Sequence, residues 1–299
     1  MANQKDMDFT YSLIDKLFRL SIGEMADFSG AKYDGDFSLT LEQAQRRKHD
    51  FVVEQVRITP GTRILDMGCG WGPMLNRIRE AGAEGVGLTL SRGQAKACRR
   101  NGLDARIVDC RTVTREMFGG FDGVVSLGAF EHFCSIDEWQ AGQQEEIYSK
   151  LFKSVHGLLP AGGRFFLQTM VFGRNMIPFE QIDIEAAPDS DAFVLALLSK
   201  QFPGSWLPYG DEQLLRTAQP YFRAISKSSG RLDYIETIRQ WRRRFARRSV
   251  RKLPVYLSLI PRYLTSKDFR QAFMSGVSAN TICFERELLE HYRIVFEKV

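Results

Sequence analysis

Fold and chemistry both follow from the segment RILDMGCGWGPML, residues 63–75. Its first part is apolar and indicates a strand, its three glycines indicate a turn, and Pro73 suits the first position of a following helix. Glycines at alternate positions let the backbone take positive φ, so that amide groups and a helix N-terminus can face an anion. Because such a turn also occurs without a ligand, other motifs must decide its purpose.

Composition limits the class of protein. The chain has 299 residues, of which 44% are hydrophobic, so we expect one globular domain with an elaboration. The net charge is +5, from 41 basic and 36 acidic residues, which is too small to indicate a nucleic-acid-binding protein. The five cysteines include no C-x-x-C pair, so the sequence predicts neither a disulfide framework nor a metal site.

The first residues and the apolar runs give an expected location. Residues 1–8 carry charges where a signal peptide would be apolar, and no apolar run approaches the roughly 20 residues that span a bilayer. We therefore expect a cytoplasmic protein whose membrane contact, if it has any, is peripheral and at the inner surface.

Helix and strand patterns alternate on both sides of the glycine turn. This alternation predicts an α/β fold with a doubly wound parallel sheet. Ser91 and Gln94 have the spacing of a capping box, and Thr40 is placed to cap a helix. The expected helices are 8–25, 40–56, 73–81, one opening at 91, and 138–158. The expected strands are one that runs into the glycine turn, 85–90, a short one ending near 109, 123–127 and 164–169.

The chain divides into four expected parts. Residues 1–57 form an N-terminal helical cap, 58–170 a ligand-binding core, 171–270 a lid insertion, and 271–299 the C-terminal part of the core. The third part shows no strand–helix–strand units, but it contains an apolar run at 193–198 and an apolar helical face that includes Tyr234.

Ligands bind to doubly wound sheets at the carboxyl ends of the strands, near the reversal in strand order. The glycine turn, Thr89 to Gln94 and Glu131 all fall there. A nicotinamide dehydrogenase would place an acidic residue at the end of the second strand. Residues 89–91 are Thr-Leu-Ser instead, which argues against a dinucleotide.

Three motifs in order now resemble one family. DMGCGWG at 66–72, GLTLS-x-x-Q at 87–94 and VSLGAFEHF at 125–133 look like the cyclopropane-fatty-acid and mycolic-acid cyclopropane synthase family of S-adenosylmethionine-dependent methyltransferases. The similarity extends through FSGA at 28–31 to Tyr234 and Trp241. It implies a Rossmann-like class I methyltransferase fold with N-terminal helices and a helical lid, and an enzyme of lipid biosynthesis.

The resemblance also implies a cofactor site. A pair of residues closes over S-adenosylmethionine, glycines cradle its methionyl part, a second group holds the ribose, and two residues lie beside the adenine. Gln94 could instead serve only the helix cap, and Cys110 could be only a small buried residue. The closing pair is Phe28 and Ser29, and the residues at the methionyl part are Asp66, Gly68, Gly70 and Gly72. The residues at the ribose are Thr89, Leu90 and Gln94, and those beside the adenine are Asp109 and Cys110.

The family's reaction transfers a methyl group to the double bond of a lipid acyl chain and leaves a carbocation. Such a site must exclude water, stabilise positive charge and remove a proton. In the family a bicarbonate ion takes the proton, and it is held by a Cys, a Glu, a His with a nearby backbone group, and a Tyr. Glu131 and Tyr234 match two of these, while Gly30 stands in place of the Cys and Gln168 in place of the His.

These departures leave several outcomes open. Gly30 keeps a backbone N–H and Gln168 keeps a hydrogen-bonding side chain, so bicarbonate remains a second expected ligand. Otherwise the cation is resolved by proton loss from the chain, water attack or reduction to a methyl branch, or Glu131 is itself the base. A small-molecule acceptor and a binding protein without catalysis are the alternative functions.

A basic stretch in the third part suggests a partner. No acidic residue occurs at 242–252, and apolar residues follow directly. A charge run is often only a solvated face, but this density favours docking to an anionic membrane surface or an acidic acyl carrier protein, and no motif supports nucleic acid. The basic residues are Arg242, Arg243, Arg244, Arg247, Arg248, Arg251 and Lys252.

Overall fold

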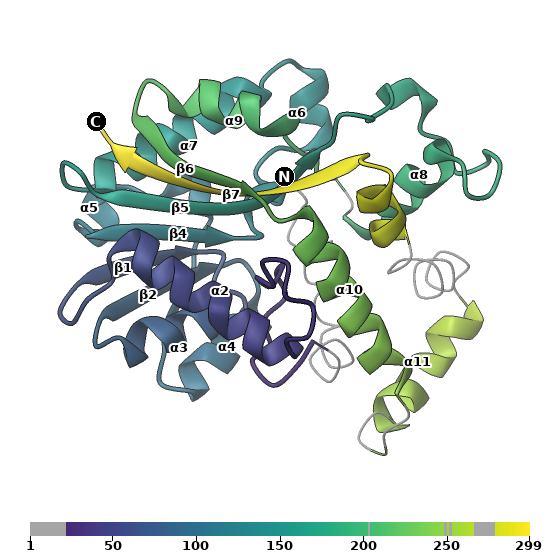
Figure 1. The fold of residues 1–299 in the computed structure, drawn as a ribbon, viewed down its shortest axis with the longest axis horizontal. Coiled ribbons are helices and arrows are strands. Elements are labelled where there is room, and N and C mark those ends of the chain that lie inside the picture. The colour runs from purple at the N-terminus through teal and green to yellow at the C-terminus, as the bar shows by residue number, and fades with distance from the viewer. Residues whose placement is uncertain (1–21, 203, 248–249, 251–252, 266–278) are drawn as a thin grey trace.

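The fold is built on one mixed β-sheet. The computed structural model describes residues 22–299 apart from 203, 248–249, 251–252 and 266–278. In this part of the chain seven strands form a sheet with the order β3-β2-β1-β4-β5-β7-β6 (Figure 1). The strands are β1 (Arg63–Met67), β2 (Glu84–Thr89), β3 (Asp104–Ile107), β4 (Gly123–Leu127), β5 (Arg164–Phe172), β6 (Phe222–Ser229) and β7 (Leu289–Lys298).

Strands β1 to β5 run parallel, and β7 is antiparallel to both of its neighbours. The strand order reverses between β1 and β4, so the predicted doubly wound sheet is confirmed, with an antiparallel edge added by β6 and β7. The predicted helix 8–25 lies mostly outside the described residues, and residues 22–25 are not helical.

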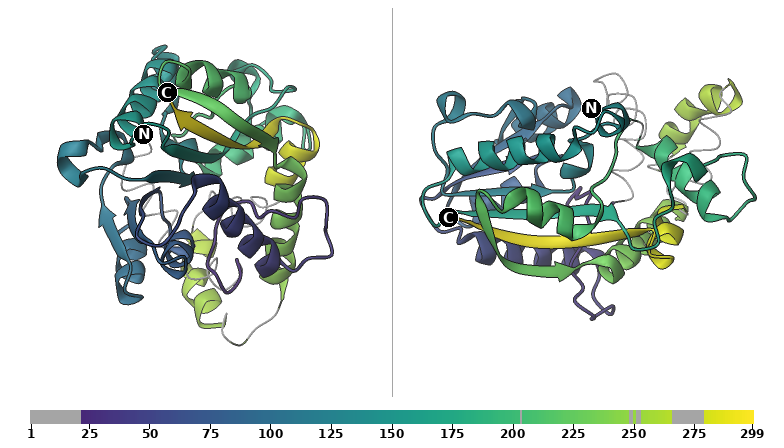
Figure 2. Two further views of the ribbon diagram at one scale, coloured as in Figure 1. Left: turned by 60° about the vertical axis from the view of Figure 1, so that its left-hand side comes forward. Right: turned by 90° about the horizontal axis from the view of Figure 1, so that it is seen from above.

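Helices cover both faces of the sheet, as Figures 1 and 2 show from three directions. α2, α3 and α4 lie on one face, and α7 and α9 on the other. No helix of the described chain is both long and apolar enough to cross a bilayer. The helices are α2 (Leu41–Val56), α3 (Pro73–Glu80), α4 (Arg92–Arg100), α5 (Arg115–Phe118), α6 (Ile136–Gln140), α7 (Gln144–Leu158), α8 (Asp191–Gln201), α9 (Gly210–Ala218), α10 (Arg231–Ala246) and α11 (Leu253–Thr265), with short 3₁₀ turns η1 (Cys110–Thr112), η2 (Phe130–His132) and η3 (Phe179–Gln181).

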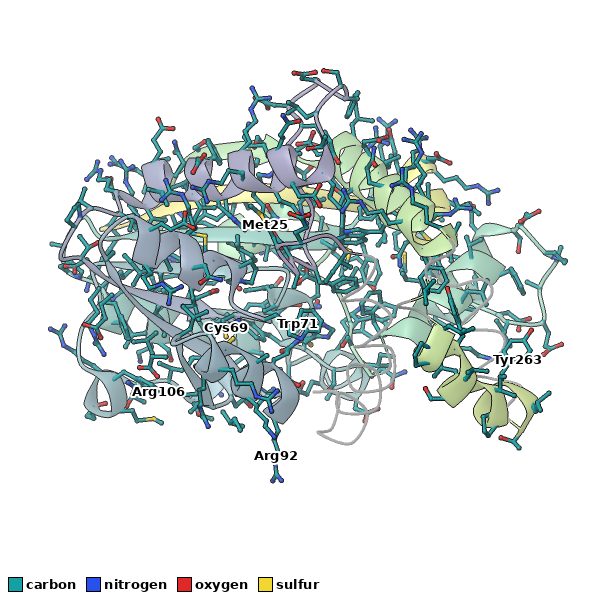
Figure 3. All side chains as sticks on the ribbon, turned by 90° about the horizontal axis from the view of Figure 1, so that it is seen from below. Met25, Cys69, Trp71, Arg92, Arg106 and Tyr263 are labelled. Carbon is teal, nitrogen blue, oxygen red and sulfur yellow. The ribbon has the colours of Figure 1, made fainter. Side chains whose placement is uncertain are left out.

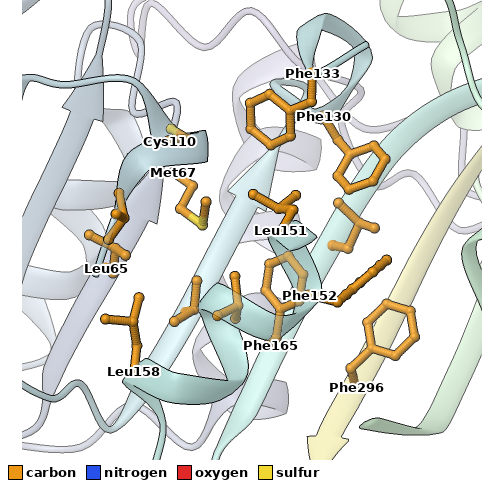
Figure 4. Packing of buried hydrophobic residues seen from close by; sticks show 14 of the residues in the cluster. Leu65, Met67, Cys110, Phe130, Phe133, Leu151, Phe152, Leu158, Phe165 and Phe296 are labelled. Atoms are coloured by element: carbon orange, nitrogen blue, oxygen red, sulfur yellow. The ribbon is translucent and has the colours of Figure 1, made fainter. Parts of the chain in front are cut away.

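The central strands are buried on both faces, which explains their continuous apolar sequences. Leu65 and Phe165 pack with Phe152 of α7 on one side, as Figure 4 shows, while Ile64 and Phe166 pack with α2 and α3 on the other. Each fully buried side chain of this size stabilises the fold by about 1.5–3 kcal/mol. The sheet is therefore a rigid platform for the loops at its carboxyl edge.

Two helix predictions need correction. Thr40 caps α2, as expected, and Gln43 completes a capping box there. Ser91 makes only half of one: it accepts from the Gln94 backbone, while the Gln94 side chain bonds Thr89. The predicted helix 138–158 is broken into α6 and α7 at Gly142, whose φ is +71°.

The predicted lid, 171–270, also contributes to the sheet. Its segment β6 pairs with β7, and α9 packs beside β5. Only Phe222 of β6 is buried, because β6 is an edge strand, and so its sequence carries no apolar signal. What extends beyond the sheet is α8, α10 and α11 (Figures 1 and 2).

Candidate active site

The glycine turn has backbone geometry that favours glycine at each of its three positions. Gly68, Gly70 and Gly72 have φ values of +90°, +54° and +85°. A Cβ at Gly68 would lie 2.2 Å from the Cβ of Ala129, at the end of β4. The turn and the β4 loop therefore approach each other as closely as backbones can. Cys69, within the turn, lies near the centre of the molecule in Figure 3.

A cavity opens at the carboxyl ends of β1, β2 and β4, where the strand order reverses. It is lined by every predicted cofactor residue except Gly72, and also by Asp27, Ala129 and His132. Gly72 is set back from it: a Cβ there would meet Leu103 at 2.6 Å, so this glycine serves packing of α3 rather than the cavity. The other residues are brought together as the sequence predicted.

An unpaired carboxylate faces this cavity. Asp66 is 2% exposed, and its Oδ2 has no hydrogen-bond partner among the described residues. Burial raises the pKa of Asp66 to about 7, nearby Asp27 adds to the rise, and Lys48 opposes it. A buried acceptor without a donor fits the α-ammonium group of S-adenosylmethionine.

The opposite side of the cavity offers groups for a nucleoside. The Thr89 hydroxyl donates to Gln94 Oε1 at 2.7 Å, which leaves the Gln94 amide nitrogen to donate to a ribose hydroxyl. Asp109 caps η1 by accepting from the Arg111 backbone at 2.9 Å. Burial raises the pKa of the Cys110 thiol, so Cys110 is a neutral, apolar wall for an adenine.

One wall of the cavity belongs to the segment 27–31, which precedes α2. Phe28 stacks on Trp241 of α10, with 5.0 Å between ring centroids and 17° between planes. The backbone N–H of Ala31 donates to Thr237 of the same helix at 3.0 Å. The segment is thus held from the lid side by α10.

A second cavity lies beside the first. Glu131 of η2 is 3% exposed; its Oε1 accepts from the Met170 backbone N–H at 2.8 Å, and its Oε2 has no partner in the described part of the chain. Burial raises the pKa of Glu131 to about 7, against the lowering effect of the Met170 hydrogen bond. The walls around Glu131 are mostly apolar and include Phe172 and Leu195.

His132 connects the linings of the two cavities. It lines the first, while its Nδ1 lies 3.0 Å from the hydroxyl of Ser205, which lines the second. Burial lowers the pKa of His132 to about 4, so the ring is neutral at physiological pH. Glu131 and His132 are adjacent in η2 and therefore face the two cavities from one short turn.

The remaining predicted catalytic residues are engaged elsewhere. Gln168 donates to the Gly30 carbonyl at 3.0 Å and accepts from Arg293 at 3.2 Å. The space above Gly30 is filled by rings: a Cβ there would lie 3.0 Å from His291 and 3.2 Å from Tyr234. None of these residues lines either cavity described above. The bicarbonate site expected from these residues stays a prediction, and no step is assigned to bicarbonate.

Sequence reasoning missed a buried polar cluster behind the segment 27–31. Lys48 and His49 of α2 both contact Asp27, and all three side chains are buried. One signal was present: Leu41, Lys48 and Val52 share the helical spacing of the apolar face of α2, so a lysine stands at a core position. His291 is also buried, but nothing in the sequence around it indicated a buried polar residue.

Comparison with known proteins identifies the fold and the family. The family model described as mycolic acid cyclopropane synthetase matches residues 1–276 of this chain. The chain belongs to that family. It is 32% identical over 241 residues to cyclopropane mycolic acid synthase 3 of Mycobacterium tuberculosis, covering 77% of this chain and 78% of the relative. It is 29% identical over 248 residues to the hydroxymycolate synthase MmaA4 of Mycobacterium bovis, covering 79% and 76%.

Solved structures show the same fold. The mycolic acid cyclopropane synthase CmaA1 in complex with SAH and CTAB matches 99% of this chain and 98% of its own, with a TM-score of 0.77 and 24% identity. Coclaurine N-methyltransferase matches 97% and 82%, with a TM-score of 0.73 and 15% identity, so that likeness concerns the fold. As a member of the mycolic acid cyclopropane synthetase family, the chain is an S-adenosylmethionine-dependent methyltransferase.

Proposed function

We propose that the chain methylates the double bond of an unsaturated lipid acyl chain and forms a cyclopropane or methyl-branched product through a carbocation. The observation that carries this proposal is the place of Glu131. A buried carboxylate with one unpaired oxygen lines a mostly apolar cavity, and its chain neighbour His132 lines the cofactor cavity. The apolar walls match the chemistry of an acyl chain, and a cation needs such an oxygen.

Held by the glycine turn, Asp66 and Gln94, the cofactor would supply an electrophilic methyl group to the double bond, and the acyl chain would then carry the positive charge. The apolar walls, including Phe172 and Leu195, exclude water. Oε2 of Glu131 then accepts a proton. Loss from the new methyl carbon closes a cyclopropane, and loss from an adjacent chain carbon leaves a methyl-branched alkene.

Isotope labelling tests this proposal. Cells that express the protein with methyl-labelled methionine are expected to carry label in their fatty acyl chains, and cells that express Glu131→Gln are expected to carry none above background. Separation of the labelled acids identifies a cyclopropane or a branch. Absence of label in every acyl fraction, from a protein that binds cofactor, would refute the lipid substrate.

A small-molecule acceptor is the second candidate. It is favoured by the hydroxyls of Ser199 and Ser205, which give the second cavity some polar surface. Purified protein distinguishes the two: dispersed unsaturated phospholipid should accept label from S-adenosylmethionine if the first proposal holds, whereas a small polar acceptor requires label only in a water-soluble product.

The docking surface proposed for the basic stretch needs one correction. Arg242, Arg243 and Arg247 are exposed on and just after α10. Arg244 is not available, because both its terminal nitrogens bond Glu42, at 2.5 and 2.6 Å. Arg248, Arg251 and Lys252 lie outside the described residues.

We propose that α11, with the exposed arginines before it, docks to an anionic lipid surface. α11 contains no acidic residue, and it projects from the body of the protein, with Tyr263 far from Cys69 in Figure 3. Leu257 and Leu264 are 57% and 69% exposed. Apolar side chains next to arginines match the interface of an anionic membrane.

Vesicle flotation tests the docking. The protein should float with vesicles that contain phosphatidylglycerol and not with phosphatidylcholine alone, and Leu257→Asp with Leu264→Asp should abolish flotation. Leu232→Asp is the matched control, because Leu232 is also 57% exposed but lies at the start of α10. Binding to an acidic carrier protein without flotation would refute the membrane partner.

A further inference from the structure

The buried lysine behind the cofactor cavity has partners that belong to the cavity itself. Lys48 is fully buried, and its ammonium lies 2.5 Å from Asp27 Oδ2 and 2.6 Å from Ser29 Oγ. An unpaired ammonium at this depth would cost several kcal/mol, so these contacts are required by the fold. Both partners, however, line the cofactor cavity.

The ammonium determines which way the Ser29 hydroxyl points. An ammonium has three donors and no acceptor, so Ser29 Oγ must accept from Lys48. The single hydroxyl proton of Ser29 goes instead to Asp27 Oδ1, at 2.7 Å. Ser29 therefore has no donor left, and it can offer the cavity only a lone pair.

The neighbouring carboxylate gives the wall the same polarity. Asp66 Oδ2 is also an acceptor, and it is unpaired within the described residues. Burial alone would raise the pKa of Asp27, but the charge of Lys48 and the nearby His49 bring it well below its usual range, so Asp27 is ionised. The amino-acid half of the cofactor carries one cationic donor, its α-ammonium group.

We infer that Lys48 is a positioning residue: by fixing Asp27 and Ser29 it makes this wall an acceptor surface that selects the ammonium group of the cofactor. It acts through its two partners and does not touch the cofactor. Without it, Ser29 could turn its proton toward the cavity, and Asp27 would keep a buried charge without its main partner.

Two cofactor fragments separate positioning from general stability. S-adenosylhomocysteine carries the amino-acid half, and 5′-methylthioadenosine lacks it. By calorimetric titration, Lys48→Met should weaken S-adenosylhomocysteine at least tenfold and change 5′-methylthioadenosine less than twofold. Lys298→Met is the matched control, because the Lys298 ammonium likewise has two acceptors, the backbone carbonyls of His156 and Leu159. This variant should leave both affinities unchanged.

A second variant covers the case in which Lys48→Met fails to fold. Asp27→Asn with Lys48→Met removes both buried charges together, which is often neutral for stability. It should be folded and still bind S-adenosylhomocysteine at least tenfold more weakly. Wild-type affinity in this variant, or equal losses for both fragments, would overturn the inference. A wild-type chain that binds neither fragment would overturn the cofactor cavity itself.

Discussion

Stability as a function of pH offers a direct measure of the environment of Glu131. Burial raises the pKa of this carboxyl to about 7, whereas the unfolded chain has the ordinary value of 4.5. The native state therefore holds its proton where the unfolded state has already released it. The stabilisation from this group is complete below about pH 4.5 and is lost as the pH rises through about 7.

The size of the effect follows from the two pKa values. Their difference, at about 1.4 kcal/mol for each pH unit, amounts to about 3 kcal/mol, of which about 2.5 kcal/mol should be lost between pH 5 and pH 8.5. Glu131→Gln removes the ionisation. Replacing the carboxyl by an amide has a cost that is the same at both pH values. Between pH 5 and pH 8.5 the variant should therefore become more stable, relative to the wild type, by about 2.5 kcal/mol.

Urea unfolding of both proteins at pH 5 and pH 8.5 measures this double difference, which is the difference between the two proteins in how much their stability changes with pH. Asp66 and the other titratable groups that both proteins share contribute equally and cancel. The control is Glu146→Gln on the exposed side of α7, where a hydrogen bond from Lys150 lowers the pKa, so its effect is confined to pH values below 5. A double difference for Glu131→Gln under about 0.5 kcal/mol would show that Oε2 of Glu131 is not buried without a donor, and would refute the base assigned to the reaction.

Glycine substitutions test the close contacts at Gly68 and at Gly30. Gly68→Ala forces a Cβ to within 2.2 Å of Ala129 at a φ of +90°, so it should abolish S-adenosylhomocysteine binding in a titration and lower stability by more than about 2 kcal/mol. Gly30→Ala meets the His291 ring at 3.0 Å and should cost about 1–2 kcal/mol in urea unfolding, and adding His291→Ala should restore at least half of that.

Gly142→Ala is the control for both, because its φ is +71° and no atom lies within 4 Å of the new Cβ. It should cost about 1 kcal/mol and leave cofactor affinity unchanged. Equal losses of affinity at Gly142 and Gly68 would contradict the steric explanation, and failure of His291→Ala to rescue Gly30→Ala would contradict the contact between those two residues.

The sequence predicted those features whose signals are local. The glycine turn, the Thr89 loop and Glu131 each follow a strand directly, so parallel strands carry them to one edge of the sheet, and the alternating pattern was enough to place them. β6 was missed because an edge strand needs no apolar face. The break in the helix at 138–158 was missed because an isolated glycine is also tolerated within helices.

Long-range polar partners could not be predicted in the same way. Lys48 pairs with Asp27 across 21 positions, and Gln168 with Arg293 across 125. A lysine on an apolar helical face signals that a buried partner exists, but no periodicity says which one. The hydrogen bond between Gln168 and Arg293 depends on β7 lying beside β5.

The hydrogen bond between the segment 27–31 and β7 determines when, during folding, the cofactor site can form. Arg293 donates to the Ala31 carbonyl at 2.7 Å, across 262 positions of the chain, and pairs with Asp233 at 2.9 Å. Contacts of such separation form late and slowly, because loop closure precedes any gain from them. During synthesis on a ribosome, the wall over the cofactor can close only after β7 has left the exit tunnel. Competence for cofactor binding should therefore appear abruptly once β7 has emerged.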